Sequence, residues 1–158
     1  MATPAAQFTQ PGYEVSCDPA RLDFNVIHAY ISGESYWAKG IPAETLKRAV
    51  ANSLCFGLYE QSTGAQVGFA RLVTDRATFA YLADVFVLAA HRGKGLSKLI
   101  MQAVMAHPEA QGLRRWMLAT ADAHSLYTQF GFTAPARPER LMERVFPDIY
   151  KNLAGTTP

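Results

Sequence analysis

The sequence predicts an α+β domain built around one mixed sheet. Helical patterns come first, strand patterns follow, and the second half alternates strand, helix, strand, helix and strand. The most apolar strand pattern, Thr78 to Leu88, has Asp84 as its one charged residue, which is typical of a strand buried on both faces. A glycine-rich turn and an amphipathic helix follow directly. This part of the chain therefore forms a βαβ-like unit.

Length and composition indicate one globular domain. The chain has 158 residues, of which 49% are hydrophobic and 18% charged. The net charge of +2 is too small for the dense basic face of a nucleic-acid-binding protein. No apolar stretch approaches the ~18 residues that span a bilayer, and the N-terminus does not resemble a signal peptide. We expect a cytoplasmic protein with neither nucleic-acid nor membrane partners.

The N-terminal third begins with an irregular segment and continues with two helices. Residues 1–12 are rich in Ala, Thr, Gln and Pro and are expected to be poorly ordered, with a single domain over 13–150 and a tail at 151–158. A short strand is expected at 13–16. Asp18-Pro19 is typical of a helix start, and Pro42 opens a second helix.

The remaining elements follow from apolar periodicity and from Gly and Pro punctuation. The expected strands are 54–60, 66–74, 78–88, 115–120, 132–134 and 141–146, and the expected helices are 96–107 and 123–130. Gly131 ends the second of these helices. Cys17 and Cys55 have no metal-like spacing and are expected to be thiols, although one disulfide stays open.

The turn Arg92-Gly93-Lys94-Gly95-Leu96-Ser97 has the chemistry of an anion site. The first turn of a helix has unpaired N–H groups, and its dipole favours negative charge. The two glycines allow a ligand to approach the backbone, and Arg92, Lys94 and Ser97 add charge and a hydroxyl donor. The spacing matches neither a P-loop nor a dinucleotide fingerprint.

Two segments of the chain resemble the hallmarks of the GNAT superfamily of N-acetyltransferases. The first is the turn at 92–97, in which Ser97 stands where the family has Gly or Ala. The second is the set Ala123, Tyr127, Gly131 and Phe132. The resemblance covers roughly residues 12–146. It implies the GNAT acyl-CoA N-acyltransferase fold, with about six to seven strands flanked by about four helices.

The resemblance also implies where acetyl-CoA binds, with no metal. In the family, the central strand parts from its neighbour and the pantetheine arm lies in the gap. Main-chain groups of Phe86, Val87 and Leu88 are then expected to bind this arm. The N–H groups of Arg92, Gly93, Lys94, Gly95, Leu96 and Ser97 are expected to hold the pyrophosphate.

Direct attack of an amine on the thioester requires two proton transfers. A lysine-like amine has a pKa near ~10.4, and a leaving thiol has a pKa near ~8.5. Tyr127, at the family's matching position, is the candidate acid and also a cofactor contact. Asp84 is the candidate base, because a carboxylate in an apolar strand needs a partner or a function. Equally, Asp84 could hold a residue on the substrate side of the site in place.

The acceptor site is expected between the first two helices, their connection and the C-terminal strands. Glu34, Tyr36, Trp37 and Tyr81 are its candidate residues. The favoured acceptor is a primary amine of a small or amino-acid-like molecule. A peptide or protein amine and a non-catalytic acyl-CoA-binding role stay open. Homodimers are common among proteins of this kind, and no motif here decides the matter.

Overall fold

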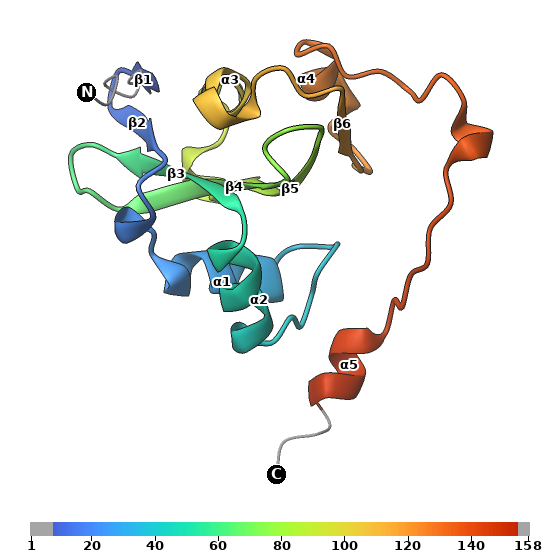
Figure 1. Cartoon of the computed structure of the whole chain (residues 1–158). Coiled ribbons are helices and arrows are strands. Elements are labelled where there is room, and N and C mark those ends of the chain that lie inside the picture. The colour runs from blue at the N-terminus through green and yellow to red at the C-terminus, as the bar shows by residue number, and fades with distance from the viewer. Residues whose placement is uncertain (1–7, 155–158) are drawn as a thin grey trace.

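The computed structural model describes residues 8–154, which form a six-stranded mixed sheet with helices on both faces (Figure 1). The strands are β1 (Phe8–Gln10), β2 (Tyr13–Ser16), β3 (Leu54–Glu60), β4 (Gln66–Thr74), β5 (Phe79–Val87) and β6 (Arg115–Leu118). They lie in chain order. Neighbours from β1 to β5 are antiparallel, whereas β5 and β6 are parallel. The predicted α+β class is confirmed.

Five α-helices accompany the sheet in the described part of the chain. They are α1 (Phe24–Gly33), α2 (Ala43–Ala51), α3 (Leu96–Ala106), α4 (His124–Thr128) and α5 (Ile149–Ala154). Helix α3 covers one face of the sheet, and α1 and α2 cover the other (Figure 1). The core consequently has two parts. One surrounds the apolar face of α3, and the other joins Ile27, Ile31 and Leu46 to Phe69 and Phe86.

A β-bulge interrupts the pairing of β4 with β5. Phe69 pairs with Phe86 and Arg71 pairs with Ala83, so Asp84 and Val85 together stand opposite Ala70. Asp84 has a left-handed backbone (φ 56°), a conformation that Asp tolerates better than most residues. A bulge bends its strand and redirects side chains. Here it turns the carboxylate of Asp84 towards Trp37 and Arg71.

Beyond the bulge, β5 loses its second neighbour. Strand β6 pairs with β5 only from Phe79 to Leu82, opposite Arg115 to Leu118. The C-terminal half of β5, residues 83–87, is hydrogen-bonded to β4 alone. The two parallel strands therefore part at the end that leads into the glycine-rich turn.

Two expectations for the N-terminal region are wrong. Phe8–Gln10 forms β1 on the edge of the sheet, although this segment was expected to be poorly ordered; residues 1–7 lie outside the described residues. Asp18 caps only the 3₁₀ turn Pro19–Arg21. Helix α1 begins later, where Asp23 accepts hydrogen bonds from the N–H groups of Asn25 and Val26.

The expected closing strands are also absent from the described residues. Residues 132–134 and 141–146 pair with no strand, and the chain between α4 and α5 contains only the 3₁₀ turn Pro138–Arg140. Helix α5 extends over Ile149–Ala154, across the expected domain boundary at 150. Of the helices described, none combines the length and the hydropathy that crossing a bilayer would take.

Candidate functional site

A cavity of about 310 Å³ lies at the N-terminus of α3. Gly93 and Gly95 have left-handed backbones (φ 79° and 72°), and no atom lies within 4 Å of where either would carry a Cβ. No side chain caps this helix, so the first-turn N–H groups are not occupied by a capping residue. Ser97 lines the same cavity. The turn thus has the open backbone and the free donors that an anion requires.

The two basic side chains of the turn point in different directions. The Arg92 guanidinium lies at the cavity, where Nε donates to the carbonyl of Val87 (2.9 Å) and Nη2 to the hydroxyl of Tyr30 (3.0 Å). Lys94 does not line the cavity, because its Nζ donates to the Tyr13 hydroxyl (3.0 Å) behind the turn. The Tyr13 hydroxyl also contacts Nδ1 of His91 at 2.8 Å. The turn is therefore tied to β2.

A second and larger cavity, of about 810 Å³, continues from the first along the parted strands. Val87, Arg92, Ser97 and Leu126 line both cavities. One wall is the unpaired half of β5, including Phe86, and the opposite wall is the chain from Leu118 to Ala123. Leu88, which was expected to bind the cofactor, donates its N–H to the carbonyl of Val67 at 2.8 Å and lines neither cavity.

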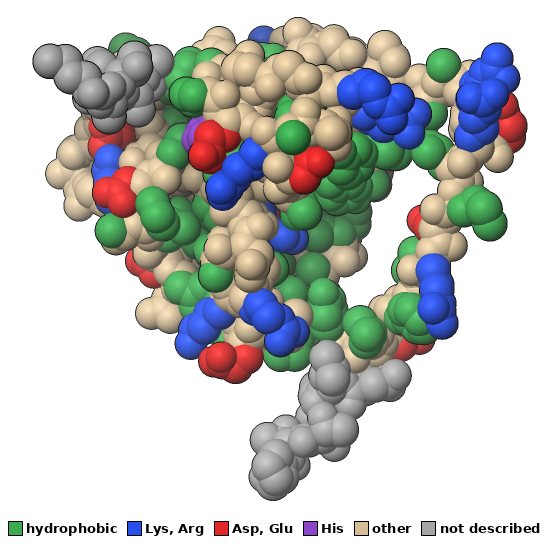
Figure 2. Space-filling model, viewed as in Figure 1, with side chains coloured by type: hydrophobic (Ala, Val, Ile, Leu, Met, Phe, Trp, Pro, Cys, Tyr) green, Lys and Arg blue, Asp and Glu red, His purple; other side chains and the backbone are tan. Residues whose placement is uncertain are grey.

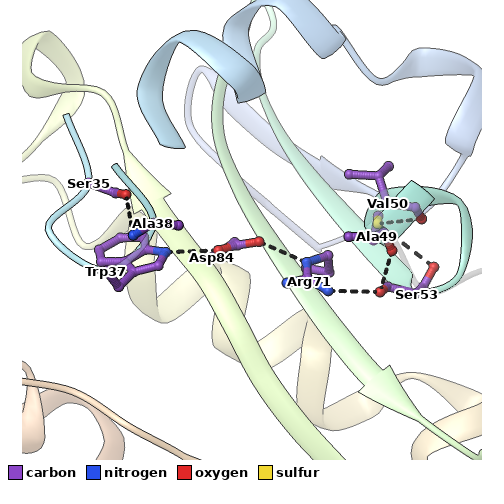
Figure 3. A network of polar contacts seen from close by, with 9 residues as sticks. Ser35, Trp37, Ala38, Ala49, Val50, Ser53, Arg71 and Asp84 are labelled. Atoms are coloured by element: carbon purple, nitrogen blue, oxygen red, sulfur yellow. Dashed lines mark hydrogen bonds and ion pairs between the residues drawn. The ribbon is translucent and has the colours of Figure 1, made fainter. Parts of the chain in front are cut away.

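Asp84 lies at the centre of a polar network that crosses the sheet (Figure 3). Its Oδ1 accepts from the indole Nε1 of Trp37 and its Oδ2 from Nε of Arg71, both at 2.8 Å. The side chain of Asp84 is only 5% exposed and that of Arg71 is 17% exposed. Arg71 Nη1 continues the network to Oγ of Ser53 at 3.3 Å. Both carboxylate oxygens therefore have partners, as a buried charge requires.

Tyr127 is buried in α4 and lines the larger cavity. Its ring packs edge-on against Phe132, with centroids 6.1 Å apart. Among the side chains that the structure describes, those of residues 8–151, its hydroxyl has no hydrogen-bond partner. Burial raises the pKa of Tyr127 to about 12, with smaller contributions from Tyr36 and Asp122. The phenol therefore keeps its proton at neutral pH and faces the cavity as a donor.

The loop between α1 and α2 forms the outer wall of the larger cavity. Tyr36 and Trp37 contact each other edge to face (5.0 Å), and the Tyr36 hydroxyl accepts from the backbone N–H of Ala121 at 2.9 Å. This bond connects the loop to the start of the β6–α4 segment across the cavity. Glu34 and Tyr81 also line it. All four expected acceptor residues thus meet in one cavity.

Sequence reasoning missed several lining residues that come from distant elements. Tyr30 stacks on Phe86 (4.1 Å) and holds Arg92, and Arg71 partners Asp84. Tyr150, from α5, lines the larger cavity, and Lys98 lines the smaller one. A signal existed for Arg71, since it is the single charge within the apolar strand β4. For Tyr30 and Tyr150 the sequence offers none, because only the tertiary fold brings them to the site.

The described residues contain no group of three or more His, Cys, Asp or Glu side chains placed to hold a metal ion. The polar groups of the two cavities include hydroxyls, guanidinium groups, carboxylates and backbone N–H groups, together with the side chains of His91, Lys98, Gln129 and Trp37. This donor set suits an anionic organic ligand at the turn and a polar ligand in the larger cavity.

Comparison with known proteins agrees with this geometry. Residues 51–134 match the family model for the acetyltransferase (GNAT) domain. A Gibberella zeae protein, provisionally named an acetyltransferase, is 37% identical in an alignment of 145 residues that covers 79% of this chain and 81% of that protein. A Xanthomonas campestris crystal structure, provisionally assigned to the GNAT family, is 54% identical with a TM-score of 0.85. The match covers 90% of this chain and 99% of that one.

More distant structures share the fold. A GNAT acetyltransferase from Elizabethkingia anophelis, solved with acetyl-CoA bound, has a TM-score of 0.59 at 10% identity, with 87% of this chain and 90% of that chain covered. Taken with the matches to the family model and to the two closer proteins, the parted strands and the glycine-rich turn lead to one conclusion: this chain is a member of the GNAT acetyltransferase family.

Proposed function

We propose that this protein transfers the acetyl group of acetyl-CoA to a primary amine of a small molecule. The observation that carries the proposal is the continuity of the two cavities, which join the N-terminus of α3 to the parted strands. A pyrophosphate, an extended pantetheine arm and a separate acceptor need such an arrangement. Tyr127 lines the larger cavity, next in sequence to Leu126, which lines both.

The residues at the turn fit the charged end of acetyl-CoA. The left-handed glycines leave room for phosphate oxygens, and the first-turn N–H groups of α3, with Ser97, supply hydrogen-bond donors. Arg92 and Lys98 supply positive charge at the same cavity. Lys94 contributes through its backbone in this assignment, since its ammonium group contacts Tyr13.

When bound, acetyl-CoA supplies an acyl group activated as a thioester. The residues of the site then have two tasks, to orient the amine and to provide a proton for the departing sulfur. Tyr127 suits the second task, because its pKa of about 12 keeps the hydroxyl protonated while the cavity leaves it accessible. Glu34, at the rim, suits the attraction of a cationic amine before it loses its proton.

One contact on the acceptor side favours a small molecule over a peptide. The Tyr36–Ala121 hydrogen bond joins two walls of the cavity, where a peptide would need an open groove. Asp84 is assigned a positioning role in this proposal. Its oxygens hold Trp37 and Arg71, so its contribution is to fix the indole in the acceptor wall.

The test is a calorimetric titration of the protein with acetyl-CoA, followed by a thiol-release screen of small amines and of peptide amines. We expect binding by the parent protein and none by Gly95→Val, whose side chain fills the space that the pyrophosphate needs. Gly64→Val is the matched control, because Gly64 has the same φ of 72° and the same open surroundings in the β3–β4 turn. Retained binding in Gly95→Val would overturn the assigned site.

The same experiment separates the alternatives. Binding of acetyl-CoA without thiol release for any amine would favour a non-catalytic acyl-CoA-binding role. Thiol release with peptide amines alone would favour a peptide or protein acceptor.

A further inference from the structure

Aromatic side chains form much of the wall of the larger cavity. Three of these large rings are left partly in water, since Tyr36 is 60% exposed, Trp37 41% and Tyr81 38%. Figure 2 shows hydrophobic side chains gathered on the hollowed side of the molecule, over β5 and β6. Further rings at this cavity are Tyr30, Phe86 and Tyr150. Such a wall is suited to cover the apolar body of a ligand.

Polar contacts hold two of the exposed rings in place. The indole Nε1 of Trp37 donates to Oδ1 of Asp84 at 2.8 Å, and the Tyr36 hydroxyl accepts from the N–H of Ala121 at 2.9 Å. The two rings meet edge to face with centroids 5.0 Å apart. Aromatic pairs in stacked or edge-to-face geometry gain more than their buried area alone supplies. An aryl group therefore gains more from this wall than a saturated ring of equal size.

The acceptor side of the cavity carries unpaired negative charge. The charged residues that line the cavity are Glu34, Arg71, Asp84, Arg92 and Asp122. Arg71 and Asp84 form an ion pair at 2.8 Å, so their charges cancel. Arg92 also lines the smaller cavity, where the proposed pyrophosphate would neutralise it. Neither Glu34 nor Asp122 forms an ion pair with any side chain that the structure describes. Two carboxylates are thus left to attract a cation.

These two carboxylates are carried by segments that meet across the cavity from Tyr127. The hydrogen bond between Ala121 and Tyr36 joins the two segments. Glu34 is two residues before this tyrosine, and Asp122 directly follows Ala121. Burial raises the pKa of Tyr127 to about 12, and the charge of Asp122 adds to this effect. The phenol itself is buried and lines the same cavity. An ammonium group is therefore attracted to the region where its nitrogen has to react.

The same charges disfavour an acceptor that carries an acid group. A carboxylate next to the amine would face Glu34 and Asp122. Of the two cations that line the cavity, Arg71 is already paired and Arg92 lies at the cofactor turn. Lys39, in the α1–α2 loop, does not line the cavity. Like charges placed together are strongly unfavourable, so amino acids should be poor acceptors.

We infer that the acceptor is an arylalkylamine, a small primary amine that carries an aromatic ring and no acid group. This inference rests on the proposed function and names the chemical class of its acceptor. The aryl group lies against Tyr36 and Trp37, and the ammonium group lies near Glu34 and Asp122. The amine nitrogen bonds to the acetyl carbon as the C–S bond breaks, and Tyr127 protonates the sulfur. The two protons that the ammonium group loses go to water and to the phenolate.

The test compares phenethylamine, cyclohexylethylamine and phenylalanine as acceptors. Thiol release at saturating acetyl-CoA gives kcat/KM, and calorimetric titration of the protein–CoA complex gives the affinity of each amine. We expect phenethylamine to exceed cyclohexylethylamine by roughly 2- to 10-fold in kcat/KM, because only the first has an aromatic ring. It should exceed phenylalanine by about 10-fold or more, because only phenylalanine has a carboxylate.

Matched variants assign each preference to its residues. Trp37→Phe and Trp37→Leu both lose the hydrogen bond to Asp84, but only the second loses the ring. The preference for phenethylamine over cyclohexylethylamine should persist in Trp37→Phe and fall towards one in Trp37→Leu. Glu34→Gln combined with Asp122→Asn should weaken the discrimination against phenylalanine. Glu139→Gln, which changes an exposed carboxylate that lines neither cavity, should leave it unchanged.

The outcomes separate this inference from the proposed function. Thiol release that is equal or faster with phenylalanine or cyclohexylethylamine would overturn the inference and leave acetyl transfer intact. If acetyl-CoA binds but no amine releases thiol, the proposed function fails. The order of the three affinities for the protein–CoA complex then decides the inference alone, and equal affinities or no binding would overturn it.

Discussion

The hydroxyl of Tyr127 combines burial, a free donor position and a pKa raised to about 12. For Tyr127→Phe we expect turnover to fall ~10-fold or more with little change in acetyl-CoA affinity, because a proton donor is lost while the ring contacts remain. Steady-state kinetics and calorimetry measure the two quantities. Tyr59→Phe, which removes a buried hydroxyl that lines neither cavity, is the control. Equal rates in both variants would exclude Tyr127 as the acid.

The raised pKa also predicts the pH behaviour of this step. Tyr127 stays protonated as pH rises through 10, and it loses its proton only near pH 12. Any change in rate between pH 7 and pH 10 must then arise from other groups, such as the amine. The pH profiles of the parent protein and of Tyr127→Phe should have the same shape over this range. If the parent protein's pH profile had a limb between pH 7 and pH 10 that is absent from Tyr127→Phe, the assigned pKa of Tyr127 would be contradicted.

The two carboxylate oxygens of Asp84 accept hydrogen bonds from Trp37 and Arg71. A positioning role and a role as general base therefore predict different effects when one of these groups is changed. For Trp37→Phe, which removes one donor only, we expect a higher KM for the amine with kcat nearly unchanged. Asp84→Asn should destabilise the fold by about 3–5 kcal/mol, because Arg71 then loses its buried charged partner. Urea unfolding measures this cost. A shifted pH profile in a well-folded Asp84→Asn variant would restore the base hypothesis.

Tyr59 offers a stability test away from the site. Its hydroxyl is buried and has no partner among residues 8–154, and burial raises its pKa from 10.0 to about 12. The unfolded chain thus releases this proton first, so stability is complete below pH 10 and declines as pH rises towards 12. Tyr59→Phe should unfold at equal or slightly higher urea concentration at pH 8, and decline less at pH 11. A clear loss of stability at pH 8 would indicate a missed partner.

At the scale of elements, the α1–α2 loop is held to the β6–α4 segment by one side-chain hydrogen bond. Tyr36→Phe removes this bond to Ala121 and keeps the ring against Trp37. A neutral hydrogen bond contributes about 0.5–1.5 kcal/mol, so we expect KM for the amine to rise roughly 2- to 10-fold. Acetyl-CoA affinity should not change, which calorimetry tests. An unchanged KM would mean that the loop closes without this bond.

Local signals predicted the elements whose neighbours in sequence are also their neighbours in space. The strands β3, β4 and β5 form a meander, and α3 follows a glycine-rich turn, so apolar periodicity and turn residues were sufficient. The segment Leu141–Phe146 is also largely apolar, but strand formation needs a paired edge, and in the described part of the chain this segment pairs with no strand. Asp18 has a side chain suited to capping, yet helix α1 begins only after Asp23, because the chain must first turn away from β2.

The same reasoning separates the parts of the site. The glycine-rich turn and Tyr127 were predictable, since each belongs to a short pattern with its own local chemistry. The partners of Asp84 were not, because Trp37 and Arg71 reach it from a loop and a strand whose register the sequence does not reveal. Lys94 illustrates a further limit: its spacing suited a phosphate, but Tyr13 of β2 holds its ammonium group behind the turn.

In the whole molecule, the parting of β5 from β6 divides the domain into two unequal parts. The strands β1–β5 and helices α1–α3 supply most of the two core clusters. Strand β6 pairs with β5 only along a short ladder, and α4 adds only Tyr127 to the buried residues of the larger cluster, with Trp116, Leu118 and Leu126 packed at its margin. The smaller cavity bridges this division, because residues from Arg92 to Lys98, except Lys94, line one side of it and Ser125, Leu126 and Gln129 line the other. A ligand bound there contacts both parts and should couple their motions.

We therefore expect acetyl-CoA to protect the backbone amides of β6 and α4 from hydrogen exchange more than those of β3 and β4. Short ladders at the margin of a sheet open more easily than the core, and a ligand that bridges two parts lowers the population of such openings. Hydrogen exchange measured by mass spectrometry, with and without acetyl-CoA, compares the two regions. Gly95→Val should abolish the protection, whereas Gly64→Val should retain it, since only the first glycine lies at the cavity. Uniform protection of all strands would instead mean that β6 and α4 open together with the rest of the sheet, and that the parting of the strands is not a mechanical boundary.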